Sequence, residues 1–206
     1  MLADLGFIAL LFAFIAAVYS AAAAWYGNRT GQPAWVESAR NATIAVFFLV
    51  LLASILMVVS LLRNDFSVEY VWRVSSRDMP TYLKVTALWG GQAGSLLFWN
   101  LMLAAFTAAS MFRNWDRQRD LMPYALIVAS LTQIFFFFIT VFIENPFARL
   151  DMVPPDGNGL NPLLRHPGMI IHPPMLYLGF VGFTVPYTFA MAALMANRLD
   201  DTWIHI

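Results

Sequence analysis

Long apolar runs separated by short polar segments dominate the hydrophobicity pattern of this chain. Five runs carry no charged residue, and each approaches or exceeds the about 20 residues that a helix needs to cross a bilayer core. They cover residues 5–25, 43–62, 95–112, 121–143 and 175–196. The pattern predicts an all-α fold, a polytopic membrane helical bundle of about five transmembrane helices, with residues 1–206 as a single membrane domain. Asn41, just before the second run, is expected to cap its helix.

The composition supports a membrane protein and excludes several kinds of chemistry. Hydrophobic residues make up 60% of the chain and charged residues 12%, and the mean hydropathy is +0.66. An ordinary soluble domain carries far more charge, so membrane lipid is an expected partner. The formal net charge is zero, so we expect no nucleic-acid partner. The sequence has no cysteine, which excludes disulfides and thiolate metal sites.

The segment from Trp89 to Ser95, WGGQAGS, interrupts the third apolar stretch. Each of its three glycines weakens a helix by about 1 kcal/mol relative to alanine. We therefore expect a bend or re-entrant dip over residues 89–94 and a helix from about Ser95. Irregular backbone at membrane depth is tolerated against protein or a polar cavity, so the bend is a candidate wall of a site. Close helix packing at the glycines explains the pattern equally well.

The segment over residues 151–187 is the richest in proline and glycine. It holds Pro154, Pro155, Pro162, Pro167, Pro173, Pro174 and Pro186. An internal proline removes a backbone donor and clashes with the preceding helical turn. The pattern predicts a rigid, non-helical loop that runs into a transmembrane helix near Pro174.

The loops between the runs predict a topology. Residues 63–84 have mixed charge and apolar residues at alternate positions, which favours a short extended segment on the membrane surface. The basic residues divide evenly between the two sides, and those in the shorter loops predict the cytoplasmic face. The N-terminus, the glycine bend and the proline-rich loop then share the outer face.

His172 is the sharpest candidate for chemistry, because it lies among apolar residues where the chain is expected to enter the membrane. A neutral imidazole is a good axial ligand for haem iron. The alternative is a histidine that donates to a loop carbonyl and braces the turn. His166 is expected to be solvent-exposed, and it lies too close in sequence to bind the opposite face of the same iron. Trp89 could stack on a porphyrin, although tryptophans near a membrane surface are usually interface anchors.

Five motifs together resemble the N-terminal part of the CcmF/NrfE family, the membrane subunits of bacterial cytochrome c haem lyases. They are FSVEYV at 66–71, WGGQAGSLLFW at 89–99, ENPF at 144–147, LNPLL at 160–164 and PGMIIHPPMLYLGFVGFTVPYTFA at 167–190. The resemblance implies a subunit that positions haem for thioether attachment to the Cys-x-x-Cys-His motif of apocytochrome c. It implies the bacterial cytoplasmic (inner) membrane, with the motif loops facing the periplasm or the cell exterior.

The resemblance also implies a cofactor, partners and site residues. The cofactor would be haem b, shared with a partner chain that carries the family's tryptophan-rich segment, which this sequence lacks. A haem chaperone and apocytochrome c would be further partners. The candidate haem-contacting residues are Trp89, Gly90, Gly91, His166, His172, Pro173 and Pro174, with His172 as the candidate iron ligand.

The sequence departs from the family pattern at two places. Ala93 stands where the family commonly has an acidic residue, and Arg165–His166 replaces a more neutral or acidic pair. Together with the missing tryptophan-rich segment, these departures predict a chain that is not catalytic alone. Two other hypotheses remain at this point: a transporter or channel built on broken helices, and a non-catalytic scaffold of the maturation complex.

Overall fold

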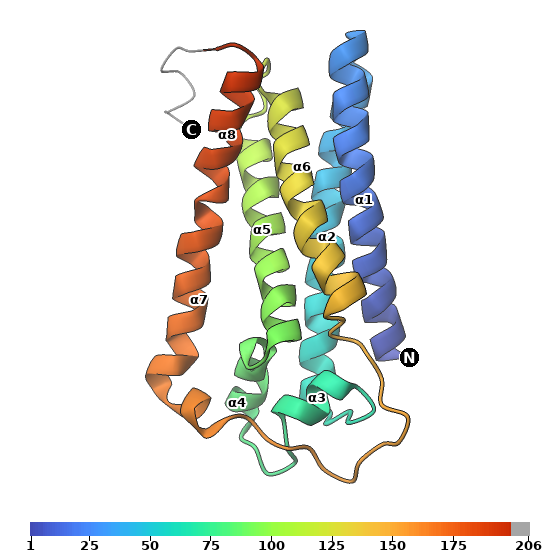
Figure 1. Ribbon diagram of the computed structural model, residues 1–206, viewed down its shortest axis with the longest axis vertical. Coiled ribbons are helices and arrows are strands. Elements are labelled where there is room, and N and C mark those ends of the chain that lie inside the picture. The colour runs from blue at the N-terminus through green and yellow to red at the C-terminus, as the bar shows by residue number, and fades with distance from the viewer. Residues whose placement is uncertain (199–206) are drawn as a thin grey trace.

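Five apolar helices run side by side along the length of the protein in a computed structural model, which describes residues 1–198 (Figure 1). All five are long and apolar enough to cross a membrane, and the described part of the chain contains no β-strand. They are α1 (Leu2–Thr30), α2 (Pro33–Leu62), α5 (Gln92–Asn114), the segment Met122–Ile143 and the segment Pro167–Met195. The fourth comprises α6 (Met122–Phe138) and a π-helical turn η2 (Ile139–Ile143), and the fifth comprises α7 (Pro167–Gly182) and α8 (Thr184–Met195). The predicted helical bundle is confirmed.

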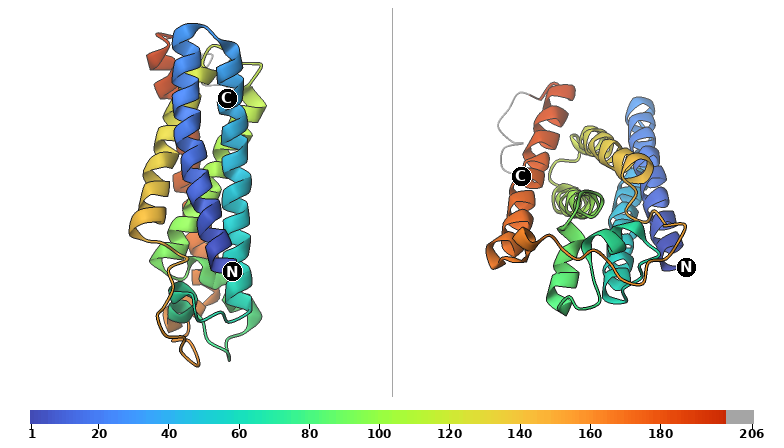
Figure 2. Two further views of the ribbon diagram at one scale, coloured as in Figure 1. Left: turned by 90° about the vertical axis from the view of Figure 1, so that its right-hand side faces the viewer. Right: turned by 60° about the horizontal axis from the view of Figure 1, so that its bottom comes forward.

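The N-terminal hairpin of α1 and α2 packs against α6 and α5. α1 and α2 are antiparallel neighbours, and α6 packs against α1 (Figure 2). α5 lies between α2 and α7, so α7 and α8 form the outer edge of the bundle (Figure 1). One side of α7 is therefore not covered by any other part of residues 1–198.

Hydrogen bonds between small polar side chains link the helices inside the bundle. Ser20 of α1 lies 2.9 Å from the Thr43 hydroxyl of α2 and accepts a hydrogen bond from Ser130 of α6 at 3.0 Å. The Asn100 amide of α5 donates to the Thr140 hydroxyl in η2 at 2.7 Å. Such bonds contribute about 0.6 kcal/mol each on average in membranes, and they also fix the rotation of each helix.

The helix starts correct two predictions. Asn41 lies inside α2, because this helix begins at Pro33, and proline is favourable in the first turn, where its missing N–H has no helical partner. The uncharged run predicted only the membrane-embedded part of the helix. α5 begins at Gln92 rather than near Ser95, with the extended Gly91 as its N-cap residue. The irregular backbone thus ends at Gly91, and Gly94 is helical.

The prediction of a proline-rich loop up to Pro174 was also wrong. α7 begins at Pro167, and both Pro173 and Pro174 lie inside it. The two prolines deprive the carbonyls of Met169 and Ile170 of their helical N–H donors, but they do not break the backbone path. Proline is tolerated in membrane helices where the freed carbonyls find other partners.

Residues 63–84 are not the extended segment that their alternating pattern predicted. They include α3 (Glu69–Val74) and the start of α4 (Thr81–Thr86), which leads into the 3₁₀ turn η1 (Ala87–Trp89). Tyr70, Val71 and Val74 are buried, and their spacing is helical. The only extended pairing in residues 1–198 is a single antiparallel bridge between Val68 and Arg149.

Candidate functional site

A folded cap closes the end of the bundle at which the N-terminus lies (Figure 1). We use the name cap for α3, α4, η1, Gly90, Gly91 and the loop over residues 144–166. The loop is fixed to α3 and its flanks through the backbone. The N–H groups of Glu69 and Leu150 donate to the carbonyls of Ala148 and Ser67 at 2.9 and 3.0 Å, and those of Asn158 and Gly159 donate to Trp72 and Ser75 at 2.8 and 2.9 Å. The N-terminus, the bend and the proline-rich loop lie at one end of the bundle (Figure 1), as expected, and that this end is the outer face stays a prediction.

Asp156 ties the middle of this loop to the segment after α3. Its carboxylate accepts hydrogen bonds from the backbone N–H groups of Arg77 at 2.9 Å and Gly157 at 2.7 Å. The bond from the Arg77 N–H is the main cause that holds the pKa of Asp156 below its usual range. The Arg77 guanidinium in turn donates to the Pro155 carbonyl at 3.0 Å. The loop is thus held by a local network, and it is ordered although it contains no long helix.

Tyr70 of α3 anchors the glycine bend at residues 89–94. Its hydroxyl donates to the carbonyls of Ala87 at 2.7 Å and Leu88 at 3.1 Å, and burial raises the pKa of Tyr70. A Cβ atom at Gly94 would lie 2.2 Å from both the Tyr70 hydroxyl and the Leu88 carbonyl oxygen. One at Gly90 would lie 2.5 Å from the Leu160 side chain of the loop. Close packing of the bend therefore accounts for both glycines.

A cavity opens beside the bend, between α3 and the end of the fourth span. Its volume is about 310 Å³. It is lined by Glu69, Tyr70, Arg73, Val74, Gly91, Gln92, Ala93, Ile143, Glu144, Asn145 and Ala148. Glu69 is paired with Arg73, so Glu144 is the carboxylate in this wall without an ion-pair partner among the described residues. The bend does form one wall of a polar cavity, as one of the two interpretations expected.

A row of aromatic rings connects the bend to α7. Trp89 packs on Phe98 with ring centroids 5.2 Å apart, and Phe98 lies 6.0 Å from Tyr177 of α7. Tyr177 also lies edge-on to Trp99 at 5.4 Å, and Trp99 stacks on Phe136 at 5.3 Å. Trp89 is thus half-buried inside the protein rather than a free interface anchor. The row sets the side of α7 that faces the bundle.

His172 lies on the other, uncovered side of α7. Its side chain is exposed and makes no hydrogen bond to any residue in 1–198, so it does not brace a loop carbonyl. Met175 and Leu176, which follow it on the same side of the helix, are exposed as well. The sequence suggested an enclosed position among apolar residues. The apolar neighbours are present, but no second element within residues 1–198 covers the imidazole.

His166 has a local structural role at the start of the same helix. Its Nδ1 accepts a hydrogen bond from the Gly168 N–H at 3.1 Å, which makes it the side-chain cap of α7. The residue is exposed, as the sequence predicted. The two histidines therefore differ: His166 is engaged in capping, whereas the ring of His172 is available.

The residues present fit part of a haem site. His172 offers one nitrogen donor beside an apolar helix surface, and Pro173 and Pro174 follow it directly in the same helix. No group of three or more histidine, aspartate or glutamate side chains in residues 1–198 could hold a metal ion. Gly90 and Gly91 lie in the cap and are occupied by contacts with Leu160, Tyr70 and Val74. A complete site would need donors from outside residues 1–198.

Sequence reasoning missed Tyr70 as a structural centre of the site. FSVEYV was noticed only as a motif, because nothing local shows that its tyrosine reaches carbonyls seventeen and eighteen residues later. The available signal was Gly94, since a glycine inside an otherwise helical run often marks a close contact. The same reasoning also missed the cavity wall formed by Glu69 and Arg73.

The fold and this cap define a class: a polytopic helical membrane protein with an ordered extramembrane face. A family model described as "Cytochrome C assembly protein" matches residues 89–205. The chain therefore belongs to the cytochrome c assembly protein family.

Curated relatives and a solved structure agree with this assignment. The chain is 38% identical to the cytochrome c-type biogenesis protein CcmF of Pseudomonas aeruginosa over 204 residues, which is 98% of this chain and 31% of that protein. It is 35% identical to NrfE of Haemophilus influenzae over 198 residues, 96% of this chain and 31% of the relative. A solved cytochrome c haem lyase CcmF matches 99% of this chain with a TM-score of 0.83 at 28% identity, over 32% of the solved chain. The chain thus spans about a third of the length of these relatives.

Proposed function

We propose that this chain is the membrane-embedded, haem-orienting part of a cytochrome c haem lyase. The observation that carries the proposal is the exposed, unpartnered His172 on the uncovered side of α7, in a chain of this family. His172 would bind the iron of haem b from one side. The haem, when bound, supplies the vinyl groups that accept the cysteine thiols of apocytochrome c. The family assignment favours this function over a transporter or channel.

The chain's own contribution is orientation. The row of rings from Trp89 to Tyr177 fixes α7 against α5, and the cap fixes the start of α7. The position of the imidazole is therefore set by the rigid part of the protein rather than by a free loop. Holding a reactant in one geometry lowers a barrier by removing the entropy of alignment. The other candidate residues would act by supporting this framework, with His166 as the N-cap residue of α7. They are Gly90, Gly91, His166, Pro173 and Pro174.

A partner segment would complete the site on the outer side of α7. The exposed side of α1 is built of large apolar residues such as Leu5, Ile8 and Phe12, which suits lipid. The exposed side of α7 also carries large apolar residues such as Met175 and Leu176, but it adds His172 and Gly179, and the space above Gly179 is open. Small residues let helix backbones approach closely in membranes, and a histidine facing lipid is unfavourable. We propose that the tryptophan-rich chain docks here, and that apocytochrome c and a haem chaperone approach from the cap side.

The same reasoning gives an orientation. The cap would lie on the periplasmic side of the bacterial inner membrane, because the shorter loops at the other end carry Arg29, Arg40, Arg113, Arg117 and Arg119. Apocytochrome c would then be joined to haem outside the cytoplasm.

Two histidine variants test the proposal, and the chain offers a matched control. His172→Gly should remove the reduced-state α and β haem bands from the chain purified with its partner segment, and it should lower cytochrome c maturation at least tenfold. Added imidazole should restore the spectrum, because it can occupy the vacated ligand position. His166→Ala, six residues away at the start of the same helix, should leave the bands in place. Equal spectra for both variants would refute the ligand role, and normal maturation in both would point to a scaffold.

A further inference from the structure

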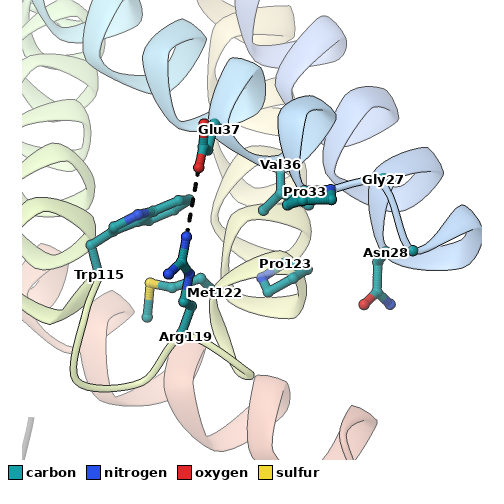
Figure 3. Close-up of a pocket in the computed structure, with 10 residues that line it drawn as sticks. Gly27, Asn28, Pro33, Val36, Glu37, Trp115, Arg119, Met122 and Pro123 are labelled. Carbon is teal, nitrogen blue, oxygen red and sulfur yellow. Dashed lines mark ion pairs between the residues drawn. The ribbon is translucent and has the colours of Figure 1, made fainter.

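A second cavity lies at the opposite end of the bundle, where the α1–α2 turn meets the loop before α6 (Figure 3). Its volume is about 350 Å³. It is lined by Gly27, Asn28, Gly31, Pro33, Val36, Glu37, Trp115, Arg119, Met122 and Pro123. Gly27 allows the turn to fold back tightly, since a Cβ atom there would lie 2.8 Å from Trp35 and 2.9 Å from Val36. This cavity takes no part in the proposed haem site.

Charges of both signs face each other across the cavity. The Arg119 guanidinium lies 3.6 Å from the Glu37 carboxylate, and Figure 3 shows the two side chains pointing toward one another past Trp115. This separation is longer than a charge-assisted hydrogen bond, which measures about 2.7–2.9 Å. The two side chains are 66% and 51% exposed, respectively. Both groups therefore keep hydrogen-bonding capacity for a ligand.

The guanidinium of Arg40 adds positive charge next to Trp115. Arg40 lies over the Trp115 ring, 4.5 Å from its centroid. Its Nε is buried and has no hydrogen-bond partner within the described chain. Trp115 itself is 7% exposed. The cavity thus combines an apolar floor, one guanidinium group and one carboxylate, with the Arg40 guanidinium against Trp115 just outside the lining.

The cavity also lies at the level of the membrane surface. Trp25 and Tyr26 end the first apolar run, and Trp35 begins the next helix; all three are exposed. Tyr26 and Trp35 pack edge to face at 5.3 Å, and Arg29 lies over Trp25 at 5.5 Å. Aromatic residues in this arrangement mark the headgroup region of a bilayer. A ligand in this cavity can therefore have its polar part here and its apolar part in the lipid.

We propose that this cavity binds the headgroup of a zwitterionic phospholipid that carries a primary amine, as phosphatidylethanolamine does. Arg119 binds the phosphate, and Glu37 accepts hydrogen bonds from the ammonium group. Arg40 adds to the positive potential that favours the phosphate. A trimethylated amine has no N–H to donate, and a glycerol headgroup has no cation, so the carboxylate selects the primary amine.

Native mass spectrometry of the detergent-solubilised chain with short-chain lipids tests this assignment. Phosphatidylethanolamine should bind about fivefold more tightly than phosphatidylcholine or phosphatidylglycerol, equivalent to about 1 kcal/mol for a partly exposed charge contact. Glu37→Gln should abolish that preference. Arg119→Gln should weaken all three lipids by a similar factor. Asp120→Asn and Arg117→Gln, which alter exposed charges in the same loop outside the cavity, should leave binding unchanged.

Several outcomes would overturn the proposal. A wild-type chain that does not distinguish the three lipids has no amine-selective site. An effect of Arg117→Gln as large as that of Arg119→Gln would show a diffuse surface charge instead of a cavity. Displacement by glycerophosphoethanolamine, which lacks acyl chains, at the same concentration as the lipid would show that the ligand is a soluble phosphoamine. Melting temperatures of all variants should match the wild type, because the substituted side chains are largely exposed.

Discussion

The substitution Gly94→Ala tests the packing of the cap most directly. The added Cβ atom would lie 2.2 Å from both the Leu88 carbonyl oxygen and the Tyr70 hydroxyl, far inside van der Waals contact. The carbonyl belongs to a short, constrained turn, and the tyrosine is buried, so neither can move without losing the 2.7 and 3.1 Å bonds to Ala87 and Leu88. Overpacking of about 1–3 kcal/mol and the loss of about 1 kcal/mol in hydrogen bonding add to about 2–4 kcal/mol.

The control for this substitution lies in the same protein. Gly179 is also a helical glycine, but the space at its Cβ position is open. Gly179→Ala should therefore raise the free energy of unfolding by about 0.5–1 kcal/mol, because alanine favours helix over glycine. Unfolding of both variants in mixed micelles, followed by tryptophan fluorescence, gives the two free energies. Equal stability of the variants would refute the packing argument, because it would mean that the bend relaxes freely around a new methyl group.

Three further measurements address the cap. Tyr70→Phe should lower the free energy of unfolding by about 1 kcal/mol. Because burial raises the pKa of Tyr70 in the folded state, the contribution of its hydroxyl to stability is complete below about pH 10 and is lost as the pH rises further. The wild type should therefore lose stability above about pH 10, and the variant should not. Asp156→Asn should remove the acid sensitivity of the loop. Because the pKa of Asp156 is lowered in the folded state, its carboxylate stabilises the loop above about pH 4, and this stabilisation disappears below it. Hydrogen exchange at the backbone N–H of Arg77 can follow the loss. Cysteines at Gln92 and Asn158 should both react with an impermeant maleimide from the periplasmic side; labelling from opposite sides would refute the shared face.

The sequence predicted the architecture well because its strongest signal has one physical meaning. An uncharged apolar run of bilayer length can satisfy its backbone only as a helix, so all five spans were found. The helix ends were less predictable. Glu37 and Arg40 lie in α2 outside the apolar run, and charge ends a membrane span without ending a helix. Local rules also treated Pro173 and Pro174 as helix breakers, because a sequence does not show which neighbours stabilise a proline-containing helix.

The site was predictable in its parts but not in its arrangement. Trp89 and His172 could be selected because their residue types are unusual at those positions. The packing of Trp89 on Phe98 depends on the turn that leads into α5. The exposure of His172 depends on the rotation of α7, which the ring contacts of Tyr177 fix. α3 was missed since its six residues fit both a helical and an alternating pattern. Only the backbone hydrogen bonds to the loop over residues 144–166 distinguish the helical from the alternating conformation.

The pairing of that loop with α3 also constrains the order in which the protein can be made. The N–H of Glu69 bonds to the carbonyl of Ala148, so α3 and the loop over residues 144–166 are separated in the sequence by five structural elements, α4 to η2. During synthesis α3 leaves the ribosome long before its partner, and non-local pairs of this kind form late. Until then the backbone groups of Glu69 and Trp72 lack their hydrogen-bond partners in the loop. The cap can therefore be completed only after the fourth span has entered the membrane. If the chain were divided between α3 and the loop, the cap could form only by assembly of the two separate chains.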